Sequence, residues 1–214
     1  MKLRLAGDTL LMAEYEPAID PAVNARVVAL ADALRKRGVD GVRDVVPGYC
    51  SLGVHFDPLR TDLLALERAV RADARAVDVS GALLRRPTIE IPVHYGGPEG
   101  PDLDEVARFA GCSARDVIEL HAATPYRVYM LGFVPGFAYL GGVPAVIAAP
   151  RHRVPRERVP AGSVGIAGQQ TGVYPIETPG GWQLIGRTTA VMFDPSRAPA
   201  SLLAPGDTVR FVPA

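Results

Sequence analysis

Hydrophobic and polar positions along the first 80 residues follow two periods, one typical of strands and one of helices. Apolar runs at residues 3–6 and 10–13, and β-rich runs at 42–46 and 51–56, have the length of strands. Between the two pairs, apolar residues recur at helical spacing: Val23, Val27, Leu30, Ala31 and Leu34. A second helical pattern begins near Thr61, with an apolar face of Leu63, Leu64, Leu66, Ala69 and Val70. This order predicts a small α+β domain of the ferredoxin-like, split βαβ type.

Residues that start and stop helices and turns support this division. Asp20 followed by Pro21 is typical of an N-cap and a first helical position, and Gly38 is typical of a helix end. Pro47-Gly48 separates two β-rich runs and predicts a hairpin. We expect this domain to be a scaffold or an interaction surface rather than a catalytic unit.

A second domain is expected after Arg86, which divides the chain into residues 1–86 and 87–214. Its first strand is predicted at 88–93, followed by a helix at 103–110 and another from Ser113, where a capping box with Asp116 is expected. From Tyr126 onward only strands and turns are predicted, with strands at 127–131, 163–167, 171–176, 182–187, 190–193 and 208–212. Many short strands separated by glycine and proline predict an all-β barrel or a sandwich.

The composition of the chain argues against several classes of partner. Lys+Arg and Asp+Glu balance at 23 each, so no overall charge attracts nucleic acid or an anionic membrane. No apolar run approaches the roughly 18 residues that a membrane span needs. Cys50 and Cys112 form no CxxC pair, and the first residues lack the pattern of a signal peptide. We therefore expect a cytoplasmic protein with reduced thiols.

The stretch from Leu131 to Arg187 carries the strongest functional signal. It holds half of the chain's 22 glycines and its only tryptophan. Glycine and proline at this density fix the backbone into turns, and aromatic side chains set among turns favour a pocket wall or a partner interface over a core. The residues predicted to form this wall are Phe133, Pro135, Phe137, Tyr139, Tyr174 and Trp182.

Several familiar catalytic motifs do not occur. No Gly-Lys-Ser/Thr is present, the glycines from Gly162 to Gly168 do not follow the GxGxxG pattern, and Ser163 has Ala161 where a GxSxG elbow needs glycine. The four histidines show neither HxH nor HExxH spacing, so no metal site is expected: His55, His94, His121 and His152. Each histidine is more simply explained as a structural hydrogen-bonding residue.

Polar candidates remain on either side of these glycines. The basic run at 151–158 is either a solvated loop or an anion clamp, since guanidinium groups pair bidentately with carboxylate or phosphate. Glu177 is either a general base or an ion-pair partner of Arg187 or of a loop arginine. Gln170 and Thr171 offer neutral donors and acceptors beside glycines that let a ligand approach the backbone.

These motifs together closely resemble the KipI / allophanate hydrolase subunit 1 family, over essentially the whole chain. The matching motifs are GFVPGFAYLG from Gly132, VPAGSVGIAG from Val159, QTGVYPIE from Gln170, PGGWQLIGRT from Pro179 and FDP from Phe193. The resemblance implies a small N-terminal α+β domain followed by a cyclophilin-like β-barrel.

The resemblance also implies a function shared with other subunits. Family members act with a PxpC/KipA-type partner and a PxpA (LamB/YcsF-type) subunit to open 5-oxo-L-proline to L-glutamate while hydrolysing ATP, with Mg²⁺ expected beside the nucleotide. Other members form the carboxyltransferase part of urea carboxylase, and KipI itself inhibits autophosphorylation of a histidine kinase. Prolyl isomerase activity rests on barrel analogy alone. Without its partner, a barrel with exposed aromatics is expected to favour homo-oligomers.

Residue type and clustering suggest roles for the candidates under this resemblance. Arg151, Arg156 or Arg187 would pair with a lactam carboxylate. Gln170 or the Gly162–Gly165 backbone would bind the amide oxygen, which becomes more negative on activation. The remaining candidates are Thr171 and Ser163 for substrate binding and Glu177 and His94 for catalysis. With no recognisable nucleotide loop, this stretch is interpreted as one wall of a shared active site.

Overall fold

The computed structural model describes residues 1–78 and 88–214 and divides into two compact units, Met1–Arg85 and Arg86–Ala214. The boundary expected at Arg86 falls outside the described residues. Each unit has its own hydrophobic core. No helix in the described ranges is long and apolar enough to cross a bilayer.

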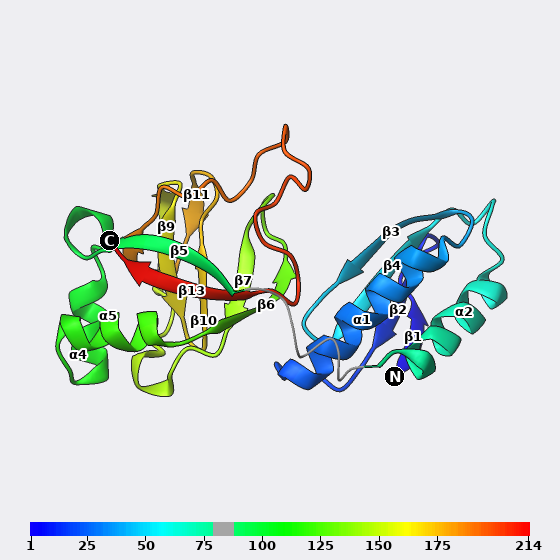
Figure 1. Ribbon diagram of the computed structural model, residues 1–214, viewed down its shortest axis with the longest axis horizontal. Coiled ribbons are helices and arrows are strands. Elements are labelled where there is room, and N and C mark those ends of the chain that lie inside the picture. The colour runs from blue at the N-terminus through cyan, green and yellow to red at the C-terminus, as the bar shows by residue number, and fades with distance from the viewer. Residues whose placement is uncertain (79–87) are drawn as a thin grey trace. The chain divides into compact units, whose positions relative to one another are not determined.

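Within residues 1–78, the N-terminal unit is a four-stranded antiparallel sheet with two helices (Figure 1). The strands are β1 (Lys2–Leu5), β2 (Leu10–Glu14), β3 (Val42–Pro47) and β4 (Ser51–Phe56), in the order β1-β2-β4-β3. The helices are α1 (Pro21–Arg37) and α2 (Leu63–Ala76). As predicted, Asp20 caps α1 through its side chain, which accepts from the backbone N–H groups of Ala22 and Val23. Gly38 ends the helix in the left-handed conformation.

The predicted hairpin is confirmed by the antiparallel pairing of β3 and β4. Strand β4 lies between β2 and β3, so β2, α1 and β3 form a split βαβ unit. The sheet's fourth strand, β1, precedes this unit in the chain instead of following α2. The ferredoxin-like assignment of the whole domain therefore stays a prediction.

The C-terminal unit is a closed seven-stranded barrel with the strand order β10-β7-β6-β13-β5-β12-β9. Its strands are β5 (Thr88–Tyr95), β6 (Tyr126–Leu131), β7 (Ala138–Gly141), β9 (Ser163–Ala167), β10 (Gln170–Val173), β12 (Gln183–Arg187) and β13 (Thr208–Pro213). Strands β5 and β13 pair in parallel, which joins the beginning and the end of the unit (Figure 1). The unit also contains the two-stranded sheet of β8 (Arg156–Val159) and β11 (Thr178–Gly180), and the short helices η1 (Gly97–Glu99) and η2 (Ala145–Ile147).

Two helices, α4 (Leu103–Ala110) and α5 (Ala114–Ala123), pack together beside the barrel. Both agree with the sequence pattern, and the capping box of Ser113 and Asp116 is present. The strand predicted at 190–193 is wrong, because the chain there makes one isolated bridge from Phe193 to Ser201. The pattern does not predict strands β7, β8 and β11, since they lie within runs rich in glycine, proline or charge.

A buried histidine connects α5 to three strands of the barrel. His121 on α5 stacks on Phe211 at 4.6 Å between ring centroids. The Tyr95 hydroxyl lies 2.8 Å from His121 Nδ1, and the Thr171 hydroxyl lies 2.9 Å from Nε2. Thr171 donates its own proton to the Gly165 carbonyl, so Nε2–H must donate to Thr171 and Nδ1 must accept from Tyr95. Burial lowers the pKa of His121 to about 3, so the ring is neutral.

The stability of the barrel should depend on pH through His121. Its folded-state pKa of about 3 lies below the unfolded value of about 6.5, so unfolding takes up a proton at any pH between these values. The contribution of neutral His121 to the unfolding free energy is fully present above pH 6.5. It falls by roughly 1 kcal/mol per pH unit as the pH drops towards 3. Urea unfolding at several pH values, followed by the fluorescence of the single tryptophan, measures this slope.

A His121→Gln variant should be less stable at pH 7 but should lose most of the slope between pH 6 and 4. The exposed His94 of the same unit is the matched control, and His94→Gln should keep the wild-type slope. An unchanged slope in His121→Gln would show that other groups cause the acid sensitivity.

Candidate functional site

Aromatic side chains from separate parts of the barrel unit enclose a hollow of about 280 Å³, called the aromatic pocket below. It is lined by Phe133, Phe137, Tyr139, Arg151, Pro155, Tyr174, Pro179, Gly180, Gly181 and Trp182. The structure thus brings together five of the six residues predicted to form a wall, with Arg151 beside them. Pro135, the sixth, lines an adjacent hollow that shares Phe133.

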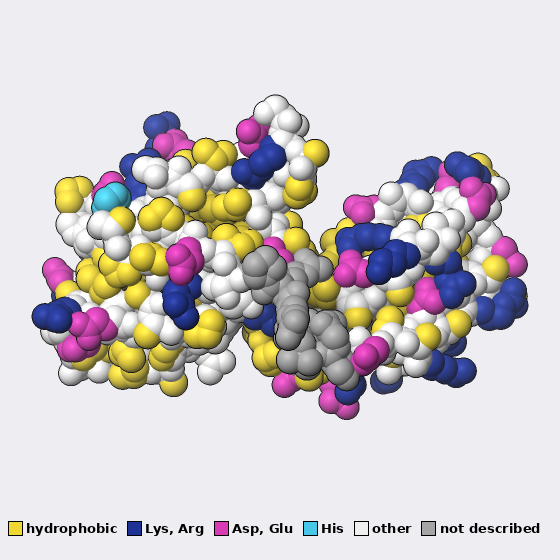
Figure 2. Space-filling model, viewed as in Figure 1, with side chains coloured by type: hydrophobic (Ala, Val, Ile, Leu, Met, Phe, Trp, Pro, Cys, Tyr) yellow, Lys and Arg dark blue, Asp and Glu magenta, His cyan; other side chains and the backbone are white. Residues whose placement is uncertain are grey.

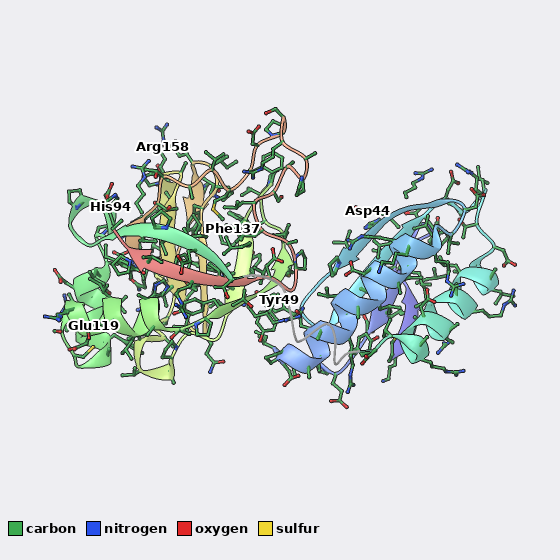
Figure 3. All side chains as sticks on the ribbon, in the orientation of Figure 1. Asp44, Tyr49, His94, Glu119, Phe137 and Arg158 are labelled. Carbon is green, nitrogen blue, oxygen red and sulfur yellow. The ribbon has the colours of Figure 1, made fainter. Side chains whose placement is uncertain are left out.

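Phe137 lies at the centre of these rings, among the barrel strands (Figure 3). It meets four aromatic rings edge-to-face, at centroid distances of 5.5 Å to Phe133, 4.9 Å to Tyr139, 5.3 Å to Tyr174 and 5.4 Å to Trp182. Each such pair adds stabilisation beyond that of the buried area. The rings therefore support one another and form a rigid wall.

Glycine allows the backbone to approach these rings. A Cβ at position 180 would lie 2.5 Å from the Tyr174 hydroxyl oxygen, and one at position 172 would lie 2.8 Å from the Ala138 carbonyl oxygen and 3.3 Å from the Trp182 ring. Contacts this short leave no room for a side chain. The glycine-rich composition of the stretch is thus explained by backbone packed on aromatic faces.

Phe133 combines an exposed side chain with a strained backbone. Its φ is +70°, and it is the one residue other than glycine with positive φ among the described residues. Its side chain is 58% exposed at the mouth of the pocket. A bulky residue in the left-handed region is strained, and such strain is found most often at ligand sites.

Arg151 lies over the face of Trp182, with its guanidinium carbon 5.8 Å from the ring centroid. Its backbone neighbours are fixed on both sides. Gln183 Nε2 donates to the Pro150 carbonyl at 3.0 Å, and the His152 N–H donates to the Gly181 carbonyl at 2.8 Å. Within residues 1–78 and 88–214, no carboxylate forms an ion pair with Arg151. The pocket therefore presents an uncompensated positive charge beside aromatic surface.

Tyr174 adds a neutral donor to the pocket. Burial raises the pKa of its hydroxyl, and the Trp182 backbone and Arg151 offset this in part. The phenol is therefore protonated at neutral pH and can donate a hydrogen bond to a ligand.

A buried carboxylate binds residues that adjoin the lining of the pocket. Asp102, 4% exposed, accepts from Arg156 Nη2 at 2.6 Å, from the Leu184 N–H at 2.6 Å and from His152 Nε2 at 3.2 Å. Asp102 is not among the site residues that the sequence predicts. Its position before α4 is typical of an N-cap, yet its side chain makes no capping bond there. Its partners are distant in sequence, so no local pattern indicates this role.

Three other candidates line a second hollow of about 400 Å³. His94 and Arg187 are directly paired across β5 and β12, and Gly162 lies beside them. His94 Nδ1 is 3.0 Å from the Ala214 carbonyl oxygen, and Arg187 Nε donates to the Ala161 carbonyl at 2.8 Å. Figure 3 shows His94 at the end of β5, well apart from Phe137.

The remaining candidates lie outside both hollows. Ser163 and Thr171 are buried, and the Thr171 hydroxyl is engaged with His121 and Gly165. Gln170 pairs with Gly141 at the start of β10. Glu177 is exposed, 3.9 Å from Arg158 and not paired with Arg187, and Arg156 is bound to Asp102. Their substrate and catalytic roles stay predictions.

In the part of the chain that the structure describes, no three His, Cys, Asp or Glu side chains are grouped so as to hold a metal ion.

Solved structures place this fold among known proteins. The chain superposes on TTHA0988 with a TM-score of 0.86 and 38% identity, over 100% of its own length and 40% of that chain. It also matches PH0987 from Pyrococcus horikoshii, with a TM-score of 0.59, 46% identity and 97% of that chain covered. The urea amidolyase of K. lactis shares the fold at 21% identity, with a TM-score of 0.75 over 99% of this chain and 15% of that one.

The sequence comparisons identify the family. Residues 1–203 match the carboxyltransferase domain, subdomain C and D, and the chain belongs to this family. It is 44% identical to the B subunit of 5-oxoprolinase from Bacillus subtilis, over 96% of this chain and 90% of that protein. It is 46% identical to the corresponding B subunit from Escherichia coli O157:H7, over 98% and 94%.

Substitution of Gly180 tests whether backbone packing on the rings shapes the pocket. In Gly180→Ala the new methyl group meets the buried Tyr174 ring, and we expect a loss of roughly 1–3 kcal/mol in unfolding free energy. Gly181→Ala is the matched control, since its nearest neighbour would lie at an ordinary 3.6 Å, and it should change stability by less than about 0.5 kcal/mol. Urea unfolding followed by Trp182 fluorescence compares them, and equal stabilities would contradict the close approach.

Proposed function

We propose that this chain is a subunit of a 5-oxoprolinase, a hydrolase complex that opens 5-oxo-L-proline to L-glutamate with hydrolysis of ATP. Two relatives that are named as B subunits of 5-oxoprolinase support this, because each matches nearly its whole length to this chain. The aromatic pocket with Arg151 is the observation that ties the activity to the structure. We propose a cytoplasmic location and a cyclophilin-like class for the barrel.

The pocket suits a small cyclic amide that carries a carboxylate. The methylene face of a lactam ring would pack against Phe137 and Trp182, and the Arg151 guanidinium would pair with the carboxylate in place of the counter-charge that the chain itself lacks. The Tyr174 hydroxyl would donate to an oxygen of the same ligand. Charge-assisted bonds beside apolar surface are stronger than in water, so this pairing supplies both orientation and affinity.

Ring opening itself requires groups from beyond this pocket. The lactam C–N bond breaks, water supplies the new carboxylate oxygen, and the carbonyl oxygen becomes more negative on the way. His94 and Glu177 stay our candidates for proton transfer, but both lie outside the aromatic pocket. We therefore propose that the pocket is one wall of an active site completed by another subunit.

The proposed partners are a PxpC/KipA-type subunit and a PxpA (LamB/YcsF-type) subunit. ATP, expected with Mg²⁺, would supply the driving force. The sequence lacks a phosphate loop with its lysine, so we expect the nucleotide at a partner or at a site of another kind. Figure 2 shows hydrophobic side chains gathered over one face of the barrel unit, which suits contact with another protein.

A related carboxyltransferase-type activity on urea or a similar amide is the second candidate. It is favoured by 26% identity to the urea amidolyase of Saccharomyces cerevisiae over 98% of this chain, which corresponds to 13% of that protein. Both candidate functions place a small amide in the same pocket, but urea has no carboxylate that could pair with Arg151.

Replacement of Arg151 tests the proposed substrate contact. In the complex assembled from all subunits, Arg151→Gln should raise KM for 5-oxo-L-proline about 10- to 100-fold, since a charge-assisted bond is worth about 1.5–3 kcal/mol and 1.4 kcal/mol corresponds to a tenfold change. Formation of glutamate and ADP measures the effect.

Arg153 provides the control for this variant. It lies two residues away in the same loop and is exposed, but it does not line the pocket. Arg153→Gln should keep the wild-type KM. If Arg151→Gln also kept it in an active complex, the pocket would not bind the substrate carboxylate.

A further inference from the structure

We propose that Asp102 is a positioning residue for the aromatic pocket. Its buried carboxylate fixes the arginine loop, residues 150–155, to β12 and thereby holds Arg151 over Trp182. Only the identity of the pocket's ligand rests on the proposed function, because the geometry is independent of it.

The carboxylate of Asp102 binds two regions of the chain that are far from it in sequence. Oδ2 accepts from the Leu184 N–H on β12 and from His152 Nε2 in the arginine loop, and Oδ1 accepts from Arg156 Nη2 at the start of β8. The two donors at 2.6 Å are charge-assisted contacts in a buried environment, where they are strong. Asp102 thus binds the arginine loop within its length, at His152, and binds Arg156, the residue that directly follows the loop.

Asp102 is itself held firmly against β12. Its backbone N–H donates to the Leu184 carbonyl at 2.9 Å, so residues 102 and 184 are joined by two hydrogen bonds. The approach depends on Gly100, where a Cβ would collide with the carbonyl of Ile185. Gly100 also donates to the Gly96 carbonyl and so closes the turn around η1. The carboxylate therefore has one position relative to the strand that follows Trp182.

Removing this carboxylate would leave buried groups without compensation. Arg156 Nη1 and Gln183 Oε1 are buried and already lack a hydrogen-bond partner among the described residues. Gln183 also holds the Pro150 carbonyl, next to Arg151. A half-buried guanidinium that loses its counter-charge moves further towards water. Arg156 would draw the arginine loop with it, and Arg151 would leave the face of Trp182.

Trp182 is the single tryptophan of the chain, so its fluorescence reports on the pocket directly. The test compares acrylamide quenching of Trp182 in the full chain for the wild type, Asp102→Asn and Asp104→Asn. Asp104 is an exposed carboxylate two residues away in the first turn of α4 and is the matched control. We expect at least a twofold larger quenching constant in Asp102→Asn and the wild-type value in Asp104→Asn.

A milder variant covers the case in which Asp102→Asn does not fold. His152→Ala removes one of the three side-chain or backbone contacts to the carboxylate and leaves Arg156 in place. It should give an intermediate quenching constant with an unchanged far-UV circular dichroism spectrum. Wild-type quenching in the folded variants would overturn the proposal.

Kinetics of the assembled complex separate this proposal from the proposed function. If both hold, Asp102→Asn raises KM for 5-oxo-L-proline at least fivefold with a smaller change in kcat, since the residue acts through the pocket. Raised quenching with unchanged KM would leave the positioning role intact and count against 5-oxo-L-proline as the ligand of this pocket. Unchanged quenching would reject the positioning role whatever the kinetics show.

Discussion

The close packing of backbone against aromatic rings is the constraint on which the site depends. Gly172 and Gly180 lie where a side chain would collide with backbone or with a buried ring, and Gly141 approaches the Tyr129 ring in the same way. Each glycine lets one strand or turn come within contact distance of an aromatic face. The rings then lock one another through edge-to-face contacts around Phe137. The result is a rigid apolar wall built from strands and from the turns between them.

The polar part of the site depends on a different kind of contact. Asp102 joins the start of α4, the arginine loop and β12 through one carboxylate, and β12 is itself fixed within the closed barrel. A preformed cationic group beside a rigid apolar wall binds a ligand without the entropic cost of ordering the wall. The aromatic rings and Asp102 thus have complementary roles: the rings shape the pocket, and Asp102 binds the loop that carries the charge of Arg151.

Local signals in the sequence predict the elements that depend on local contacts. The ends of α1 at Asp20 and Gly38 and the capping box at Ser113 follow from residues within a few positions of one another. Asp102 and Thr171 cannot be assigned in this way, because their partners include residues 50 to 82 positions away. The aromatic wall is predictable because its glycines and rings lie in one stretch of the sequence. The separation of His94 and Arg187 from this wall is not predictable, because it follows from strand pairing that no single motif encodes.

The proposed function requires that the aromatic pocket binds the substrate of a shared active site. Titration of the assembled complex with 5-oxo-L-proline, in the absence of ATP, measures this directly through Trp182, once the partner subunits' tryptophans have been replaced by phenylalanine. Substrate binding in the pocket should give a saturable change in emission with a midpoint near KM, and Arg151→Gln should abolish this change. Emission that stays constant at saturating substrate, in a complex that turns over when ATP is added, would contradict it.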